Sequence, residues 1–476
     1  MRKKKIINET VELEIESLAF QGFGVARLDG FVYFVKNAIP GDKVLANVLK
    51  KKKKHAEAKI EKIISPSPLR IEPKCKYFGI CGGCSLQNLD YSEQLKWKKQ
   101  QVEDSFQRIG NFTDFKVESS IGSTEIFYYR NKMDFSFANS RWLLPDEISS
   151  EELSKPKDFA LGLHFPTRYD KVIDIDYCYI QQSTANEILT YFRNTALEYD
   201  ISGWSNKTYD GFLRNLIIRY SFTQGKFLLI LITNEFSNQA EKDFLEKVKS
   251  EVQKLFPNVA SFHQAVNTTN NPVKVESQKL LFGSEFITEN ILGIDYQISP
   301  FSFFQTNSRE LNSFVSNIIK FTQANENDVI WDLYCGTGTI TLPLSKKVKK
   351  IIGFELSEDA IFDAKKNAKL NGIENAVFIQ EDLHKKNISE KLAEYEKPDI
   401  ITIDPPRAGM HPSLVELVLS SGAKRIVYVS CNPTTQARDC ALLSEKYRLK
   451  KVLPYDMFPH TFHVEAIAEM ELIINY

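Results

Sequence analysis

One cysteine at the end of a strand-like run is the residue in this sequence best suited to covalent chemistry. Cys431 follows the apolar run VYVS and is followed at once by Asn432 and Pro433, a pair that favours a turn. A thiol at the end of a strand can serve as a nucleophile at the mouth of a site. The alternative is simple packing, since free cysteines are commonly core residues. The other motifs have to decide between these interpretations.

A glycine-containing turn after the run VIWDLY indicates a nucleotide-type ligand. Gly336 and Gly338 let the backbone approach a ligand closely, and the helix expected after them presents free amides. Thr341 stands where a dinucleotide-binding fingerprint would have its third glycine, which disfavours a pyrophosphate. The pattern fits a ligand with a ribose and no phosphates, such as S-adenosylmethionine.

Acidic residues end the successive strand-like runs around this turn. Asp332 ends the first run, and Glu355 ends the second, where a carboxylate can accept hydrogen bonds from ribose hydroxyls. The third run ends in QED (380–382), where adenine contacts are expected, and the fourth ends in Asp404 of DPPR, whose prolines stiffen the loop. Ligands of open α/β sheets lie beyond the carboxyl ends of the strands, so Cys431 is expected beside this ligand.

This combination would permit methylation of a pyrimidine. Carbon-5 of a pyrimidine becomes nucleophilic only after a thiolate has added to carbon-6, and it can then attack a methyl sulfonium. A base must afterwards remove the carbon-5 proton so that the thiol is eliminated. His463 and Glu465 in FHVEAIAEM are expected on one face of a strand, and either could accept that proton or be an ordinary surface residue.

A second group of cysteines has the spacing of a metal site. Cys75, Cys81 and Cys84 are separated by five and then two residues, with a Gly-Gly pair that lets the loop fold tightly. Clustered cysteines in a reducing compartment more often indicate metal binding or catalysis than disulfides. A fourth thiolate would complete a zinc or an iron–sulfur site, and the spacing does not choose between them. Cys178 is a remote candidate whose alternative is core packing.

Three blocks along the chain must position these residues. Residues 6–64 contain about five short strands with glycine turns, which predicts a small closed barrel of the OB type, and SPSP (65–68) forms a linker. The second block mixes strands with short helices. From residue 286 onward strands and helices alternate, which predicts a doubly wound, Rossmann-like α/β sheet. The expected domains are 1–65, a barrel; 66–285, a mixed α+β domain; and 286–476, an α/β domain.

Composition and charge narrow the class of protein. The chain of 476 residues is 43% hydrophobic and 26% charged, which is typical of a globular protein with several domains. We find no signal-peptide core and no membrane-spanning run, so we expect a cytoplasmic protein without membrane contact. The net charge is zero, but residues 1–62 carry 14 Lys and Arg against 8 Asp and Glu. This surplus is either a handle for nucleic acid or a solvated lysine-rich loop.

Five motifs of the third block, in this order, resemble the RNA uracil-5 methyltransferase family: FFQTN, DLYCGTGT, IDPPR, VSCNP and HVEAIAEMELI. The resemblance implies S-adenosylmethionine-dependent methylation of carbon-5 of a uridine in RNA through a covalent cysteine adduct. It also implies a seven-stranded sheet whose last strand is antiparallel. It assigns Cys431 as the nucleophile and Glu465, rather than His463, as the base. Cofactor contacts carry over to Gln305, Tyr334, Glu355 and Asp404.

The first two blocks extend this resemblance. GFGVARLDG and PGDKV are similar to the turns of the TRAM domain, which gives the basic surplus a use in RNA binding. Family members with the C-x5-C-x2-C pattern and one remote cysteine hold a [4Fe–4S] cluster, which implies Cys75, Cys81, Cys84 and Cys178 as its ligands. The barrel and the cluster favour 23S ribosomal RNA over transfer RNA as the substrate, because transfer-RNA members often lack both. No obligate protein partner is implied.

Two readings compete with uridine methylation. Cytosine-5 methylation of RNA shares the thiol addition but usually places its nucleophile in another motif. A non-catalytic RNA-binding protein with a relic methyltransferase fold is the alternative from a different class, and the intact Cys431, Glu465 and Asp404 disfavour it. In either enzyme the target base has to leave its stack to reach the thiol.

Overall fold

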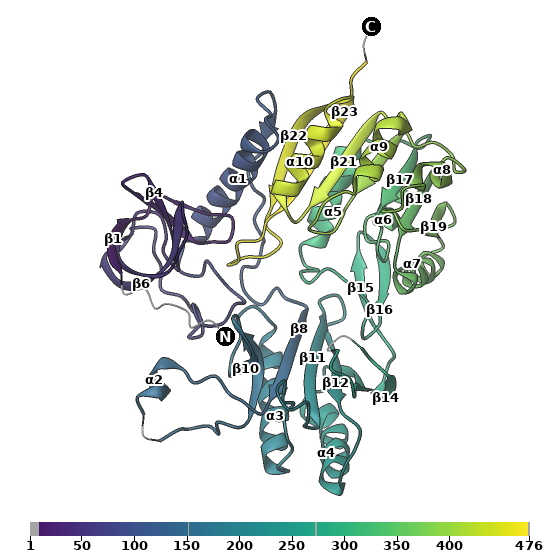
Figure 1. Ribbon diagram of the computed structural model, residues 1–476. Coiled ribbons are helices and arrows are strands. Elements are labelled where there is room, and N and C mark those ends of the chain that lie inside the picture. Colours follow the sequence, from purple (N-terminus) through teal and green to yellow (C-terminus); the bar gives the residue numbers. More distant parts are fainter. Residues whose placement is uncertain (1–8, 151, 272–273, 475–476) are drawn as a thin grey trace.

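The structure is a computed structural model that describes residues 9–150, 152–271 and 274–474. It forms a rolled N-terminal sheet, a central body and a C-terminal body of largely parallel strands with helices on both faces (Figure 1). The predicted architecture is confirmed: a Rossmann-like α/β domain, a mixed α+β region and an N-terminal β-barrel. None of the helices in the described ranges has the length and apolarity that a bilayer crossing requires.

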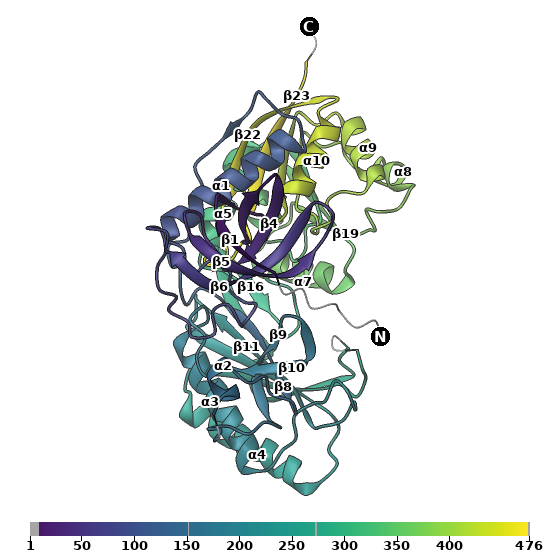
Figure 2. The same cartoon turned by 60° about the vertical axis from the view of Figure 1, so that its left-hand side comes forward.

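The N-terminal sheet has six strands in the order β1-β5-β6-β4-β3-β2 and rolls up so that β1 comes close to β3. Alternating side chains fill its interior, among them Leu13, Val35 and Ala46. The strands are β1 (Thr10–Glu14), β2 (Ser17–Leu18), β3 (Gly24–Leu28), β4 (Phe31–Lys36), β5 (Lys43–Lys51) and β6 (His55–Ser65). Figure 2 shows this barrel in front of the C-terminal body.

The central body is built on a seven-stranded sheet in the order β10-β9-β8-β11-β12-β13-β14. The run of β12 is almost entirely apolar because both of its faces are covered: Leu229 packs with the side of α3 and α4, and Ile230 packs toward the C-terminal body. The elements are α2 (Pro145–Ile148), β8 (Lys132–Ala138), β9 (Ala160–Phe165), β10 (Arg168–Asp174), α3 (Ser183–Glu198), β11 (Leu213–Ser221), β12 (Lys226–Thr233), α4 (Gln239–Leu255), β13 (Val259–Val266) and β14 (Ser277–Gly283).

The C-terminal sheet has the order β19-β18-β17-β20-β21-β23-β22-β7, and only β23 runs antiparallel to its neighbours. Its strands are β17 (Val329–Leu333), β18 (Lys350–Glu355), β19 (Ala376–Gln380), β20 (Ile400–Ile403), β21 (Arg425–Ser430), β22 (Tyr447–Tyr455) and β23 (Glu465–Leu472). The helices are α5 (Leu311–Thr322), α6 (Thr341–Ser345), α7 (Glu358–Leu370), α8 (Ile388–Leu392), α9 (Pro412–Ser421) and α10 (Pro433–Leu443). A hairpin of β15 (Ile287–Ile291) and β16 (Ile294–Ile298) precedes them.

An eighth strand and an extra helix reach this sheet from far upstream. The resemblance implied seven strands, but β7 (Lys116–Val117) pairs in parallel with β22 at the sheet edge. Helix α1 (Tyr91–Arg108) lies beside α10 and β22 (Figure 1), with Val102 and Phe106 in their core. Both elements come from the range expected for the central domain, so that range also contributes to the C-terminal body.

Candidate active site and cysteine pocket

A cavity of about 850 Å³ opens at the carboxyl ends of the parallel strands. This is the edge where ligands of open α/β sheets bind. The cavity brings together all six residues expected to act in catalysis or cofactor binding: Gln305, Tyr334, Glu355, Asp404, Cys431 and Glu465. Side chains that lie far apart in the sequence therefore share one space.

Cys431 and Glu465 each lie one residue beyond the last pair of the ladder between β21 and β23, and the Glu465 charge acts on the Cys431 thiol. Ser430 pairs with Ala466, and these are the residues immediately before Cys431 and after Glu465. Directly opposed residues of antiparallel strands have Cα atoms about 4.5–5.5 Å apart. His463 lies two residues before β23, so the expected shared strand face does not form there, although its side chain also lines the cavity.

The residue after the thiol fixes where the strand ends. Asn432 caps α10 by accepting a hydrogen bond from the Thr434 amide at 3.2 Å, and its side-chain amide donates to the Arg407 carbonyl at 3.0 Å. Pro433 begins the helix, where no amide hydrogen is needed. The turn predicted from Asn-Pro is thus a helix cap that ties the thiol to the DPPR loop.

Burial disfavours the ionised forms of three groups that line the cavity. Burial raises the pKa of Cys431 to about 11. The Glu465 carboxylate adds to this increase, and the Arg407 guanidinium opposes it. Burial and the nearby Asp404 raise the pKa of Glu465 to about 8. Burial and Asp332 raise the pKa of Asp404 to about 7. An ionised Glu465 is therefore a strong proton acceptor in this site.

His463 is a much weaker base. Burial and the positive charge of Arg407 lower the pKa of His463 to about 4. One guanidinium nitrogen of Arg407 lies 3.4 Å from its Nδ1 atom. Of the two bases that the sequence left open, Glu465 has by far the higher proton affinity.

The two acidic residues beside the glycine turn have different surroundings. Asp332 is buried, accepts hydrogen bonds from Thr341 at 2.5 Å and Thr402 at 2.7 Å, and joins β17 to its neighbours. Glu355 faces the cavity and accepts from the Gly336 amide at 3.2 Å. Gly336 has a φ of 54°, a conformation that disfavours other residues.

Asn131, which no sequence motif singled out, fastens the FFQTN loop. The Asn131 amide donates to the Thr306 carbonyl at 2.8 Å, and its side chain donates to the Gln305 carbonyl at 2.9 Å. Asn131 is itself buried. Its role could not be inferred from spacing, because it lies 174 positions from Gln305.

Helix α1 fastens the loop that leads into β23. The ammonium of Lys98 and the carboxylate of Asp456 pair at 2.6 Å with side-chain exposures of 1% and 0%. The Tyr91 hydroxyl donates to the same carboxylate at 3.0 Å, and the Gln94 side-chain oxygen accepts from the His460 amide at 3.0 Å. The placement of Glu465 thus depends on contacts to residues more than 350 positions upstream.

The four expected cysteine ligands line a second cavity of about 450 Å³: Cys75, Cys81, Cys84 and Cys178. Burial raises the pKa of each thiol, and for Cys178 to about 12. Within the described ranges no three His, Cys, Asp or Glu side chains are grouped closely enough to hold a metal ion. Four thiols on the wall of one cavity are the donor types that both structural zinc and iron–sulfur clusters use.

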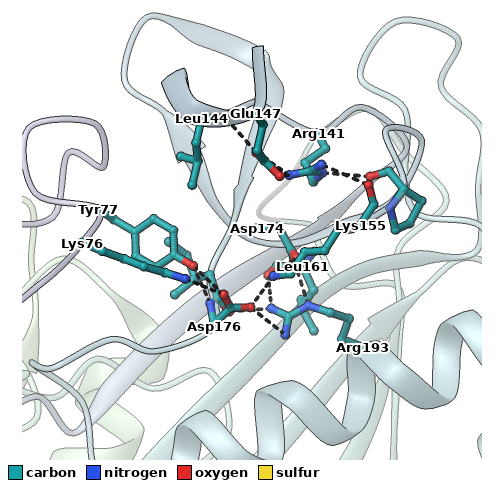
Figure 3. A network of polar contacts seen from close by, with 12 residues as sticks. Lys76, Tyr77, Arg141, Leu144, Glu147, Lys155, Leu161, Asp174, Asp176 and Arg193 are labelled. Carbon is teal, nitrogen blue, oxygen red and sulfur yellow. Dashed lines mark hydrogen bonds and ion pairs between the residues drawn. The ribbon is translucent and has the colours of Figure 1, made fainter. Parts of the chain in front are cut away.

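A polar network joins the two chain segments that carry these cysteines (Figure 3). Asp176, two residues before Cys178, pairs with Lys76 at 2.8 Å and accepts from the Tyr77 hydroxyl at 3.1 Å. Lys155 bridges Asp174 and Asp176. Burial alone would raise the pKa of Asp176, but hydrogen bonds from Lys155 and Lys76 lower it well below the ordinary range.

The two cavities share a wall. Gly82, Gly83 and Arg130 line both of them. The Arg130 side chain donates to the Lys132 carbonyl at 2.9 Å and makes no ion pair among the described residues. Arg214 of β11 lies buried over the Trp204 ring and serves packing.

Comparison with known proteins places the chain among RNA-modifying enzymes. Residues 241–471 match the family model described as tRNA (uracil-5-)-methyltransferase, and residues 4–60 match the TRAM domain. A protein of Chlorobaculum tepidum called an uncharacterized RNA methyltransferase is 40% identical, over 91% of this chain and 89% of its own. One of the same description from Bacteroides thetaiotaomicron is 39% identical, over 96% of this chain and 100% of its own.

A solved structure extends this similarity to nearly the whole chain. The tRNA (uracil-54, C5)-methyltransferase of Pyrococcus abyssi, in complex with S-adenosyl-L-homocysteine, is 28% identical with a TM-score of 0.73. The match covers 97% of this chain and 100% of that one. With the curated relatives and the family match, the fold and the shared cavity lead to one conclusion: the chain belongs to the RNA (uracil-5-)-methyltransferase family, whose members use S-adenosylmethionine.

Proposed function

We propose that the protein methylates carbon-5 of a specific uridine in RNA, through a covalent bond between Cys431 and carbon-6 of the base. The observation that carries the proposal is the opposition of Cys431 and Glu465 across β21 and β23 in one cavity. The reaction requires a thiol and a base close to the same ring, and this register supplies both.

The residues of the chain act in the following order. Cys431 loses its proton to solvent and adds as the thiolate to carbon-6, so that carbon-5 gains the electron density of an enolate. After methyl transfer, Glu465 takes the carbon-5 proton, the electron pair returns to the ring, and the bond between carbon-6 and sulfur breaks. Arg407 favours the thiolate form of Cys431, since its charge and hydrogen bond lower the thiol pKa.

S-adenosylmethionine supplies the methyl group as a sulfonium cation. We assign its binding to Gln305, Tyr334, Glu355 and Asp404, all on the cavity wall. Glu355 is suited to ribose hydroxyls because it ends β18 beside the glycine turn. The buried acidic groups around Cys431 also suit a positively charged donor.

A trapping experiment tests the mechanism. RNA that carries 5-fluorouridine has no carbon-5 proton for Glu465 to remove, so the adduct should persist after methyl transfer. A denaturation-resistant protein–RNA band that is absent for Cys431→Ala would support the nucleophile. A band only with 5-azacytidine RNA would indicate cytosine methylation instead. Neither a band nor transfer of labelled methyl would favour a binding protein without activity.

We propose 23S ribosomal RNA as the substrate, because the barrel and the cysteine pattern resemble those of family members that act on ribosomal RNA. Transfer RNA is the second candidate, and one observation favours it. The Pyrococcus abyssi enzyme named for transfer RNA covers 97% of this chain, including the barrel, so the barrel does not exclude transfer RNA. Labelled methyl transfer to purified 23S ribosomal RNA and to transfer RNA, both lacking the modification, separates the two.

For the barrel and the cysteine pocket we propose RNA binding and a [4Fe–4S] cluster. The exposed lysines at positions 50–54, at the turn between β5 and β6, suit phosphate contacts. Cys75, Cys81, Cys84 and Cys178 would hold the cluster. Iron and sulfide content after anaerobic purification should approach four of each per chain. Cys178→Ser should lower both, whereas Cys440→Ala, a buried cysteine outside the pocket, should not.

A further inference from the structure

Lys74 lies against three aromatic rings on the surface beside the cysteine pocket. Its ammonium is 4.9 Å from the ring centroid of Phe127, 5.5 Å from that of Tyr128 and 4.9 Å from that of Tyr179. Tyr177 completes the group, with its ring 4.7 Å from Tyr179 and its hydroxyl 3.2 Å from that of Tyr128. We call Lys74 and these four rings the Lys74 cage. Attraction between a cation and ring faces fixes such a side chain without neutralising it.

The cage is rigid on its aromatic side. Tyr128 has a φ of 54°, which costs a non-glycine residue of the order of 1–2 kcal/mol, so the surrounding structure must hold it there. Its amide donates to the Tyr179 carbonyl at 2.8 Å, and the Gln182 side chain donates to its carbonyl. The strained turn therefore belongs to the same unit as the rings.

The cage adjoins the rim of the active-site cavity. Tyr129 and Arg130, which follow it directly in the chain, both line that cavity. The Phe127 ring lies 4.4 Å from the ring of His460, whose loop contributes Thr461 and His463 to the same cavity. RNA whose uridine enters the cavity has to pass its neighbouring phosphates and bases over this rim.

Two exposed lysines flank Cys75, and only one of them is neutralised. Lys76 pairs with the Asp176 carboxylate at 2.8 Å (Figure 3). Among the residues that the structure describes, Lys74 has no acidic partner and no hydrogen bond. Its charge is thus held in place and remains available to an anion.

We propose that the Lys74 cage is an RNA-contacting surface at the mouth of the active site, where Lys74 binds a phosphate of the substrate strand and the rings receive an unstacked base next to the target uridine. Basic side chains combined with aromatic faces are the usual means of binding single-stranded RNA. This inference rests on the proposed function, because it takes the cavity to be where the uridine reacts.

Salt-dependent binding of a defined probe tests the proposal. A fluorescent oligouridine of about 30 nucleotides is titrated with the full-length protein at about 50–200 mM KCl. One phosphate contact to a single strand contributes about 0.7 to the slope of log K against log salt concentration. Lys74→Gln should lower that slope by about 0.7, so that its affinity deficit relative to wild type shrinks about 2.6-fold across this range. Lys74→Arg, which keeps the charge and the ring contacts, should retain the slope.

Lys76→Gln is the matched control, because Lys76 is also exposed and also adjacent to Cys75 but is already paired with Asp176. The same slope for Lys74→Gln and wild type, or an equal loss for both variants, would overturn the proposal. Iron content is measured in parallel, so that loss of the cysteine site is not mistaken for loss of a phosphate contact. The 5-fluorouridine trap reports separately on Cys431. If wild type forms the trapped adduct but Lys74→Gln leaves the salt slope unchanged, only the role of the Lys74 cage is refuted. If Lys74→Gln lowers the slope but wild type forms no adduct, only the proposed chemistry is refuted.

Discussion

Cys431 and Glu465 stand opposite each other one step beyond the last pair of the β21–β23 ladder, and the charge of Glu465 raises the pKa of Cys431. The base thus suppresses the nucleophile while no substrate is present. Because the two groups share one buried environment, a change in one should be measurable in the other.

Glu465→Gln should separate the two roles. Turnover should fall at least 100-fold, because the carbon-5 proton has no acceptor, whereas the first addition of Cys431 remains possible. The variant should alkylate with iodoacetamide faster than wild type at about pH 9.5, since removal of the carboxylate charge lowers the pKa of Cys431. His463→Ala should retain most turnover. Full activity of Glu465→Gln together with an inactive His463→Ala would reverse the assignment.

The rate should depend on pH through Glu465. Its pKa of about 8 in the free protein means that the protonated form, which cannot act as a base, predominates below this value. We therefore expect kcat/KM for methyl transfer to rise with pH from about 6, and to go on rising above 8.5, because Cys431, which also has to lose its proton, has a pKa of about 11. A profile that is flat from pH 6 to 9, measured with saturating S-adenosylmethionine, would contradict this.

Breaking the buried ion pair between α1 and the loop before β23 should be costly. Lys98→Met leaves the Asp456 carboxylate buried without its cation, and such a change costs about 3–5 kcal/mol in the free energy of unfolding. The double variant Lys98→Met, Asp456→Asn removes both charges and should recover at least about 1 kcal/mol of that loss. Urea unfolding of the single and double variants measures the difference. An additive effect of the two substitutions would show that the charges do not interact.

Asp176→Asn should loosen the cysteine pocket more than it destabilises the whole protein. Asp176 is 40% exposed, so its ion pairs contribute no more than about 1 kcal/mol to the free energy of unfolding. Because it joins the Lys76 segment to the Cys178 segment, we expect lower iron content and faster loss of iron in air. Asp170→Asn is the control, since Asp170 also accepts from two cations, Arg168 and Lys207, and lies outside the pocket. Equal iron loss in both variants would argue against a local role.

Short local motifs, spread over the third block, predicted which residues would lie together. Each acidic or nucleophilic residue at a strand end marks the same edge of a parallel sheet, and Gln305, Tyr334, Glu355, Asp404, Cys431 and Glu465 do share one cavity. Alternation of strands and helices likewise predicted the sheet. These are local signals, since period and turn chemistry act over a few residues.

The residues that hold the site in place could not be predicted from the sequence. Asn131, Lys98 and β7 act on partners more than 150 positions away, and nothing in local spacing indicates such pairs. Which of His463 and Glu465 is the stronger base also depended on burial. A histidine and a glutamate two residues apart look equally able to take a proton until the surroundings shift their pKa values in opposite directions.

The docking of α1 and β7 on the last sheet has a consequence for how the chain can be made and divided. The ribosome synthesises β22 and β23 more than 300 residues after α1. During synthesis, Val102 and Phe106 of α1 therefore stay exposed until that surface forms, or are covered by other contacts. A fragment that starts at residue 286 would expose the surface that α1 covers and would leave the edge of β22 unpaired. It would also leave the buried Asp456 carboxylate without its partner Lys98. The smallest piece that keeps the catalytic end intact therefore begins before Asp90 rather than at the start of the α/β sheet.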